Sequence, residues 1–255
     1  MFNLTLFSLL LHFAKNTKRM SASIFIPYEI DQFYPETGQN AIRILERLGY
    51  SVYYNIAQTD AGQMAFENGN WDEAKKIGEK FIKQFSKSQF IVSPSSSTVE
   101  FITQHYKKLF FNSGMHLEYQ RIANCIFEFC DFIYHQAKAR DIGAIFEHSI
   151  LFHDCYLPEK HAEMMELLSC VNGVKILKNP FQKETCGSNI IFSLNNEPIA
   201  TAMALQQISY AVKIGAEFIV VADAACKLHF DSYIKKQNFD ISVIHIVDVL
   251  ASGLK

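Results

Sequence analysis

The chain has 255 residues, of which 49% are hydrophobic and 20% are charged, with 11 glycines and 6 prolines. This length predicts one or two domains with a sizeable core, and the composition excludes disordered and fibrous proteins. The formal net charge is −2 and the basic residues are scattered, so no nucleic-acid-binding surface is expected. Six cysteines are too few for a disulfide scaffold, and we expect none of them to form a disulfide in a reducing compartment.

The N-terminus carries an apolar stretch over residues 2–13, which is too short to span a bilayer. Its positive charges, Lys15, Lys18 and Arg19, follow the apolar stretch, whereas in a signal peptide they precede it. We therefore expect no membrane span and a cytoplasmic protein. Residues 1–19 are interpreted as an over-called translation start or a docked extension, and the N-terminal extension is placed at residues 1–21.

Short β-branched or aromatic segments alternate with amphipathic segments, a pattern typical of parallel α/β proteins. In the first half the predicted strands are 24–28, 51–55 and 89–93, and the predicted helices are 38–48, 71–85 and 97–109. In the second half the predicted strands are 150–153, 174–178, 218–222 and 243–247, and the predicted helices are 159–171, 197–214 and 226–236. A long helical pattern over 117–138 lies between the halves.

The repeated order predicts an α/β fold of two similar parallel-sheet lobes that arose by internal duplication and are joined by a long helix. We place the first lobe at residues 22–112, the helical connector at 113–143 and the second lobe at 144–255. In such folds ligands bind beyond the carboxyl ends of the strands, so the loops that follow the strands are the candidate site. Equivalent loop residues repeat at similar spacing, at Tyr28, Ala61 and Thr98 and again at Tyr156, Cys186 and Cys226.

Several motifs resemble the lactate-utilization protein A (LutA/YkgE) family of CCG-domain proteins, whose module also occurs in the B subunit of heterodisulfide reductase and in the iron–sulfur subunit of glycolate oxidase. The motifs are FIP-x-x-x-DQFYP at 25–35, QT-x-x-GQ at 58–63, WDEA at 71–74 and HI-x-DVL at 245–250. The resemblance extends from about residue 22 to residue 251.

The resemblance implies two CCG modules, each of which offers four cysteines on its strand-end loops to an iron–sulfur cluster of the [4Fe–4S] type. Thiolates suit iron in such clusters because sulfur is a soft ligand. In this chain the implied ligand positions are occupied by Tyr28, Asp60, Ala61 and Thr98 in the first half, and by Tyr156, Thr185, Cys186 and Cys226 in the second. Two of the eight thiols remain, which predicts a degenerate site.

Three thiols nevertheless follow strands of the second half, at Cys155, Cys186 and Cys226, and His153 is close in sequence. Three cysteines and a histidine would suit tetrahedral zinc or another metal. The alternative is that these cysteines are small buried apolar residues. Cys155 precedes the family ligand position by one residue, so its side chain could point away from the site.

The remaining cysteines, Cys125, Cys130 and Cys170, have apolar neighbours and are predicted to pack in the core. Ser97 and Glu100 have the spacing of a helix capping box, and the neighbouring hydroxyls could alternatively bind an anion.

Asp60 beside Glu29 and Tyr28 could act as an acid or base, although solvated loop carboxylates are commoner. His105 and His245 are interpreted as structural residues. No catalytic residue is assigned.

The leading hypothesis is a diverged subunit or regulator of an L-lactate oxidising complex that lacks ordinary clusters. The resemblance implies partner subunits similar to the lactate-utilization B and C proteins (LutB-like and LutC-like). One alternative is an active redox subunit with a single atypical iron–sulfur or metal site in the second lobe. Another is a protein that binds a small organic acid in the emptied strand-end cavity.

Overall fold

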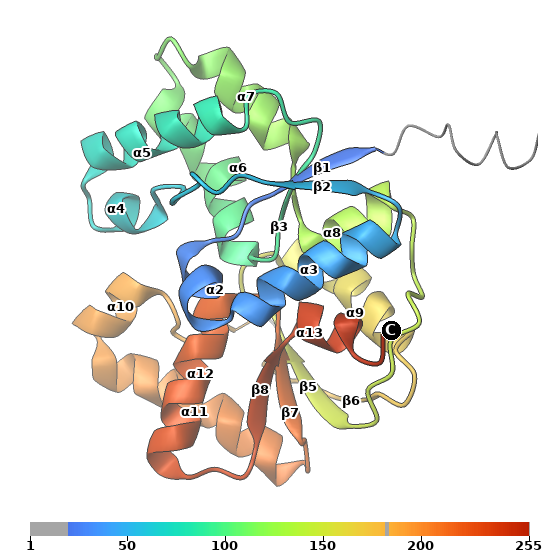
Figure 1. The fold of residues 1–255 in the computed structure, drawn as a ribbon. Helices are drawn as coiled ribbons and strands as arrows, with labels where there is room; N and C mark the ends of the chain where they lie inside the picture. The colour runs from blue at the N-terminus through green and yellow to red at the C-terminus, as the bar shows by residue number, and fades with distance from the viewer. Residues whose placement is uncertain (1–19, 182–183, 255) are drawn as a thin grey trace, which may run out of the picture.

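The computed structural model describes residues 20–181 and 184–254, so the predictions for residues 1–19 lie outside the described residues. The chain forms two four-stranded parallel sheets with the orders β2-β1-β3-β4 and β6-β5-β7-β8 (Figure 1). The first sheet consists of β1 (Ser21–Ile24), β2 (Ser51–Tyr54), β3 (Ile91–Ser93) and β4 (Ile126–Glu128). The second consists of β5 (Ser149–His153), β6 (Lys175–Leu177), β7 (Phe218–Val221) and β8 (Ser242–His245). The identical strand order confirms the predicted fold of two similar α/β lobes.

Helices connect the strands of each sheet. The helices of the first lobe are α2 (Tyr28–Phe33), α3 (Pro35–Arg47), α4 (Gln63–Glu67), α5 (Trp71–Gln84), α6 (Ser96–Phe110) and α7 (His116–Cys125). A 3₁₀ turn (Pro158–Lys160) precedes the helices of the second lobe, which are α9 (His161–Ser169), α10 (Ile190–Asn195), α11 (Glu197–Lys213), α12 (Ala224–Gln237) and α13 (Ile246–Ala251).

Helix α3 shows why the apolar spacing gives this architecture. Pro35 starts the helix, where its missing N–H costs no hydrogen bond. Ala41, Ile44 and Leu45 recur at helical spacing and are fully buried against the core that both lobes share. The amphipathic face therefore positions α3 between the sheets, where it packs beside α13 (Figure 1).

The predicted strand over 24–28 is wrong in its position. Strand β1 covers Ser21–Ile24, and Tyr28 is already the first residue of α2. Phe25 and Ile26 are buried and extend the apolar pattern. Phe25 still donates its backbone N–H to the Val92 carbonyl oxygen, but Ile26 donates to the side chain of Gln58, and Pro27, which has no N–H, is the N-cap of α2.

The predicted capping box at Ser97 is also wrong. Ser95 is the N-cap of α6, because its Oγ accepts a hydrogen bond from the backbone N–H of Thr98. Ser97 lies inside the helix, and its hydroxyl donates to Asp223 of the second lobe. The helix therefore has its N-cap two residues before the predicted position.

The continuous helix predicted over 117–138 does not form. Helix α7 ends at Cys125, and the chain enters β4, which pairs with β3 in parallel. A short helix α8 (Phe129–Asp131) and one π-helical turn (Phe132–Gln136) follow. The apolar residues of β4 complete the first sheet. This strand could not be predicted from the local sequence, because it forms by pairing with β3. The domain boundaries drawn around it stay a prediction.

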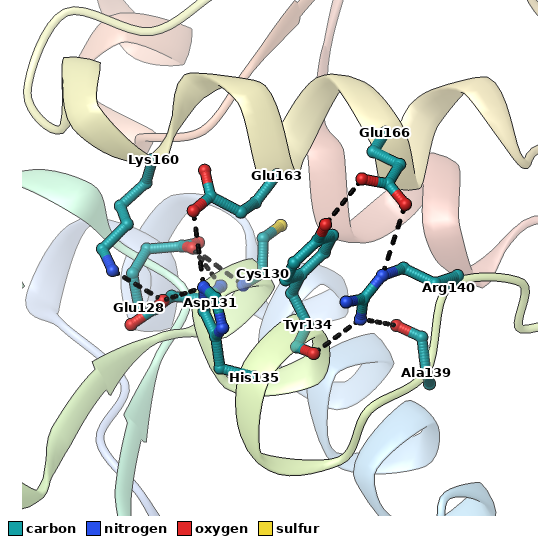
Figure 2. Close-up of polar contacts among 10 residues, drawn as sticks. All are labelled: Glu128, Cys130, Asp131, Tyr134, His135, Ala139, Arg140, Lys160, Glu163 and Glu166. Carbon is teal, nitrogen blue, oxygen red and sulfur yellow. Dashed lines mark hydrogen bonds and ion pairs between the residues drawn. The ribbon is translucent and has the colours of Figure 1, made fainter.

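The segment after β4 is attached to α9 of the second lobe by polar contacts (Figure 2). Lys160 forms an ion pair with Asp131, at 2.9 Å, and the hydroxyl of Tyr134 donates to Glu166, at 2.6 Å. Arg140 lies 3.3 Å from the same glutamate. These contacts connect the segment after β4 to the second lobe.

Candidate functional site

A cavity of about 620 Å³ lies between the lobes, beyond the carboxyl ends of the strands. The first lobe lines it with residues that follow β1, β2 and β3, among them Glu29, Gln58 and Thr98. The second lobe contributes Tyr156, Ser188 and neighbouring residues. Ligands of open parallel α/β sheets bind at this location, so the cavity is a candidate binding site.

The first-lobe residues at the implied cluster positions surround this cavity or support it. Tyr28, Asp60 and Thr98 line the cavity. One carboxylate oxygen of Asp60 accepts hydrogen bonds from the backbone N–H groups of Ala61 and Gly62, so Asp60 fixes its own loop. Ala61 is buried, and its carbonyl oxygen accepts from the Tyr106 hydroxyl at 2.8 Å. None of these four side chains is a thiol, so the first lobe does not fit an iron–sulfur cluster.

The second lobe brings three thiols together. The Sγ atom of Cys226, at the start of α12, lies 3.5 Å from Cys186 Sγ and 3.6 Å from Cys155 Sγ. Cys186 and Cys226 are almost completely buried, and Cys155 is half-buried. One ligand atom from each of His153, Cys155, Cys186 and Cys226 lies within 4.8 Å of the others. The three strand-end loops therefore converge on one point.

Cys155 points into this cluster, so the concern that it would point away was wrong. The side-chain alternation of a strand applies only while the chain is extended, and β5 ends at His153. Asp154 then accepts a hydrogen bond from the backbone N–H of Tyr156, which tightens the chain into a turn. This turn directs Cys155 towards Cys226 and leaves Tyr156 on the cavity side.

His153 provides a test of whether the cluster fits a metal ion. Its ring is fully buried at the end of β5, and neither Nδ1 nor Nε2 has a hydrogen-bond partner among the described residues. Buried polar atoms are normally paired, because leaving one unpaired costs about 1–3 kcal/mol. An ion bound by the three thiols would give one of these nitrogens a partner.

The spacing of the sulfur atoms distinguishes a single ion from a cluster. Zinc–sulfur bonds of about 2.3 Å in a tetrahedron place the thiolates about 3.8 Å apart, close to the spacing seen here. In a four-iron cluster each thiolate binds a different iron, so its ligands are spread around a much larger body. The donor set of the second lobe fits a mononuclear ion and does not fit a [4Fe–4S] cluster. Thr185, at another implied ligand position, uses its hydroxyl to accept from the Gly187 backbone N–H.

The thiols differ in acidity. Burial disfavours the thiolate of Cys186, but hydrogen bonds with Cys155, Cys226 and Ser188 outweigh burial and lower the pKa of this thiol. Hydrogen bonds with Cys155 and Cys186, together with burial, raise the pKa of the Cys226 thiol. Cys186 is therefore a more acidic thiol than Cys226.

Ser188, which no sequence motif identified, connects the two parts of the site. Its Oγ lies 3.3 Å from Cys226 Sγ and 3.2 Å from the Tyr156 hydroxyl. Tyr156 and Ser188 both line the cavity, so the thiol cluster and the cavity share a wall. The position of Ser188, two residues after Cys186, was the only signal for it in the sequence.

Two buried carboxyl groups were also missed. Glu128, at the end of β4, accepts hydrogen bonds from the backbone N–H groups of Cys130 and Asp131. Burial, reinforced by the negative charge of Asp154, raises its pKa to about 8. Burial likewise raises the pKa of Asp154 to about 6.

The predictions for the other cysteines and histidines have mixed outcomes. Cys130 is fully buried, as predicted, whereas Cys125 and Cys170 are only partly buried, and all six cysteines are free. His245 caps α13 by accepting from the Val247 backbone N–H, which is a structural role. His105 is partly exposed, 3.8 Å from Glu100.

Known proteins resemble this chain over most of its length. The model of the CCG family, described as a cysteine-rich domain, matches residues 25–97 and 150–231. Lactate utilization protein A 1 of Bacillus anthracis is 28% identical over 92% of this chain and 99% of its own length. Lactate utilization protein A of Oceanobacillus iheyensis is 28% identical over 91% of this chain and 96% of its own length.

A solved structure shows the same fold. The crystal structure of a hypothetical protein from Helicobacter pylori superposes with a TM-score of 0.68 at 9% identity, over 92% of this chain and 49% of that one. Within residues 20–181 and 184–254, no helix is long and apolar enough to cross a membrane. The two family-model matches fall on the two sheets, one in each lobe, and the chain therefore belongs to the CCG cysteine-rich domain family, among the proteins related to lactate utilization protein A.

Proposed function

We propose that this protein is a non-redox component of a lactate-utilization system that holds one mononuclear metal ion of the zinc type in its second lobe. The convergence of His153, Cys155, Cys186 and Cys226 within 4.8 Å carries the proposal. Zinc has no redox chemistry and stabilises folds by joining loops. The ion would tie together the loops after β5, β6 and β7.

The lactate-utilization role rests on the relatives, which match nearly their whole length. In this proposal the chain works in the cytoplasm, where thiols stay reduced, beside subunits similar to the lactate-utilization B and C proteins. The first lobe keeps its fold without any cluster ligand, so the protein acts as a subunit or regulator and does not carry electrons.

The decisive experiment is metal binding by protein purified without oxygen. We expect a colourless preparation with about one zinc per chain, because one four-ligand site binds one ion. Metal-depleted protein titrated with Co²⁺ should develop the visible absorption of tetrahedral cobalt thiolate, saturate at one ion, and lose that absorption on addition of Zn²⁺.

Serine variants locate the ion. Cys186→Ser and Cys226→Ser should each weaken Co²⁺ binding strongly and reduce the thiolate absorption, whereas Cys125→Ser and Cys170→Ser, outside the cluster, should bind like the wild type. A brown protein with several iron and sulfide ions per chain would instead establish the redox alternative. Absence of any stoichiometric metal would also contradict the proposal.

The role in lactate use needs a separate test. Deletion of the gene in its source organism should slow growth on L-lactate and leave growth on glucose unchanged, and the wild-type gene should restore growth. Unchanged growth on lactate would contradict the assignment to this system, whatever metal the protein binds.

A further inference from the structure

The cavity between the lobes has the size and position of a small-molecule site, and it shares the wall formed by Tyr156 and Ser188 with the thiol cluster. Its volume of about 620 Å³ lies within the range of roughly 300–1,000 Å³ typical of ligand pockets. Both lobes line it, yet none of the six cysteines does. The metal proposed above leaves this space free.

The charge of the lining is one-sided. Glu29, Asp31, Asp60 and Glu67 line the cavity, and the described residues around it include no lysine, arginine or histidine. Burial raises the pKa of Glu29, and the negative charges of Asp223, Asp60 and Glu67 raise it further. Removing a charged carboxylate from water costs free energy unless a positive group lies nearby. A cation bound in the cavity would offset this desolvation cost.

Gln58 places an unpaired hydrogen-bond donor beside the cavity. The side-chain oxygen of Gln58 accepts from the Ile26 backbone N–H at 3.1 Å, which fixes the amide. Its Nε2 atom is buried and has no partner among the described residues. Gln58 lines the cavity, so this unpaired donor lies next to the space that a ligand would occupy.

Apolar and aromatic side chains complete the lining. Tyr28, Tyr54, Tyr156, Ile56 and Met64 also line the cavity. Ile56 is 89% exposed and Tyr28 is 55% exposed, so both are open to a ligand. Aromatic rings beside carboxylates suit an organic cation, because a ring face also attracts positive charge.

We propose that the cavity between the lobes binds an organic amine: a small molecule with a positively charged nitrogen, an apolar or aromatic body, and a hydroxyl or carbonyl acceptor. The nitrogen lies among Glu29, Asp60 and Glu67, and the body lies against the tyrosines. An organic acid of the same size would place its carboxylate among these acidic groups, so the cavity discriminates against organic acids.

The test uses two probes of similar size and opposite charge. Tyramine carries an ammonium group on a phenol body, and 4-hydroxyphenylacetate carries a carboxylate on the same body. Titration calorimetry of the full-length protein, with its metal content unaltered, should show saturable binding of tyramine at least about tenfold tighter than binding of the acid. Tighter binding of the acid, or no saturable binding of tyramine, would overturn the proposal.

Matched variants locate the binding. Glu29→Gln and Glu67→Gln keep the side-chain shape and remove one charge each, and each should weaken tyramine binding by about tenfold, as expected for loss of a charge-assisted contact. Glu46→Gln removes an exposed charge on α3 outside the cavity and should bind tyramine like the wild type. Equal binding by all three variants would place the amine elsewhere and refute the assignment.

One more variant separates this inference from the proposed function. Cys226→Ser removes a thiol of the metal site but no cavity-lining residue. It should lose metal and keep tyramine binding as long as circular dichroism shows the wild-type fold. Loss of lactate-dependent growth or of metal binding therefore does not bear on the amine site.

Discussion

The carboxylate of Asp223, at the end of β7 in the second lobe, accepts two hydrogen bonds from Ser97 in the first turn of α6 in the first lobe. The backbone N–H of Ser97 lies 3.0 Å from Asp223 Oδ2, and its hydroxyl lies 2.7 Å from the same atom. Ser95 adds a third donor at 2.8 Å, and all three residues are buried. The helix N-terminus of one lobe thus stabilises the carboxylate of the other.

We expect Asp223→Ala to destabilise the protein by about 2–4 kcal/mol. The substitution leaves the buried donors of Ser95 and Ser97 without their carboxylate acceptor. It also removes the cap of α12, where Asp223 accepts from the Ala225 backbone N–H. Ser97→Ala removes one hydroxyl only and should cost about 1 kcal/mol. Urea denaturation measures both values. Asp240→Ala, at an exposed position, is the control and should change stability by less than about 0.5 kcal/mol. An Asp223 variant as stable as this control would show that the interlobe contact contributes nothing.

Metal removal should lower the stability of the second lobe. A ligand at one hundred times its dissociation constant stabilises the folded state by about 2.7 kcal/mol, so zinc should raise the melting temperature and a chelator should reverse the rise. Cys186→Ser should melt at the same temperature with or without zinc, whereas Cys170→Ser should keep the zinc response. A zinc response that survives in Cys186→Ser would place the ion outside the cluster.

The buried Glu128 predicts a specific pH dependence. Its folded-state pKa is about 8, above the ordinary value of 4.5, so the folded state holds a proton that the unfolded state has released between these pH values. Stability conferred by the protonated group is fully present below the unfolded pKa and is lost as pH rises through the folded pKa, with a slope of up to about 1.4 kcal/mol per pH unit.

Glu128→Gln removes this titration and keeps an oxygen that can accept from Cys130 and Asp131. We expect the free energy of unfolding of the wild type to fall relative to that of Glu128→Gln between pH 6 and pH 8, a window above the pKa of about 6 of Asp154. Denaturant titrations at several pH values measure this difference. Parallel curves for the two proteins would show that Glu128 is already ionised at pH 6.

Two glycines with nearly equal φ angles are expected to differ in how much stability is lost when each is replaced by alanine. Gly62 has φ +91° and Gly49 has φ +90°, which L-residues disfavour. A Cβ atom at Gly62 would lie 2.8 Å from the carbonyl oxygen of Ala74, whereas at Gly49 nothing lies within 4 Å. Gly49→Ala should cost about 1 kcal/mol and Gly62→Ala should cost about 2–4 kcal/mol, because backbone must move to admit the methyl group. Equal losses of stability for the two variants in urea denaturation would mean that α5 can move to admit the methyl group at little cost in free energy.

Much of the fold could be predicted from apolar spacing. Helix α5 was predicted at 71–85 and covers Trp71–Gln84, because its buried residues Ala74, Gly78 and Phe81 recur at helical spacing. Strand β7 was predicted at 218–222 and covers Phe218–Val221. Strand β4 could not be predicted, because three residues are too few to show a hydrophobic periodicity. Whether they form a strand depends on their pairing with β3.

The site was predictable only in part. The family motifs located Cys186 and Cys226, but the orientation of Cys155 depends on the turn at Asp154. Glu29 and Glu67 lie on separate helices, and only the closure of the cavity brings their charges near Asp60.

The sequence by itself determined that the chain repeats one α/β unit and that the first unit has no cluster thiol, because periodicity and residue identity are properties of the sequence. Only the tertiary structure decided that His153 and three cysteines converge and that an acidic cavity forms between the lobes. These features join loops that are about 30 to 200 residues apart, and their geometry depends on how the two sheets pack.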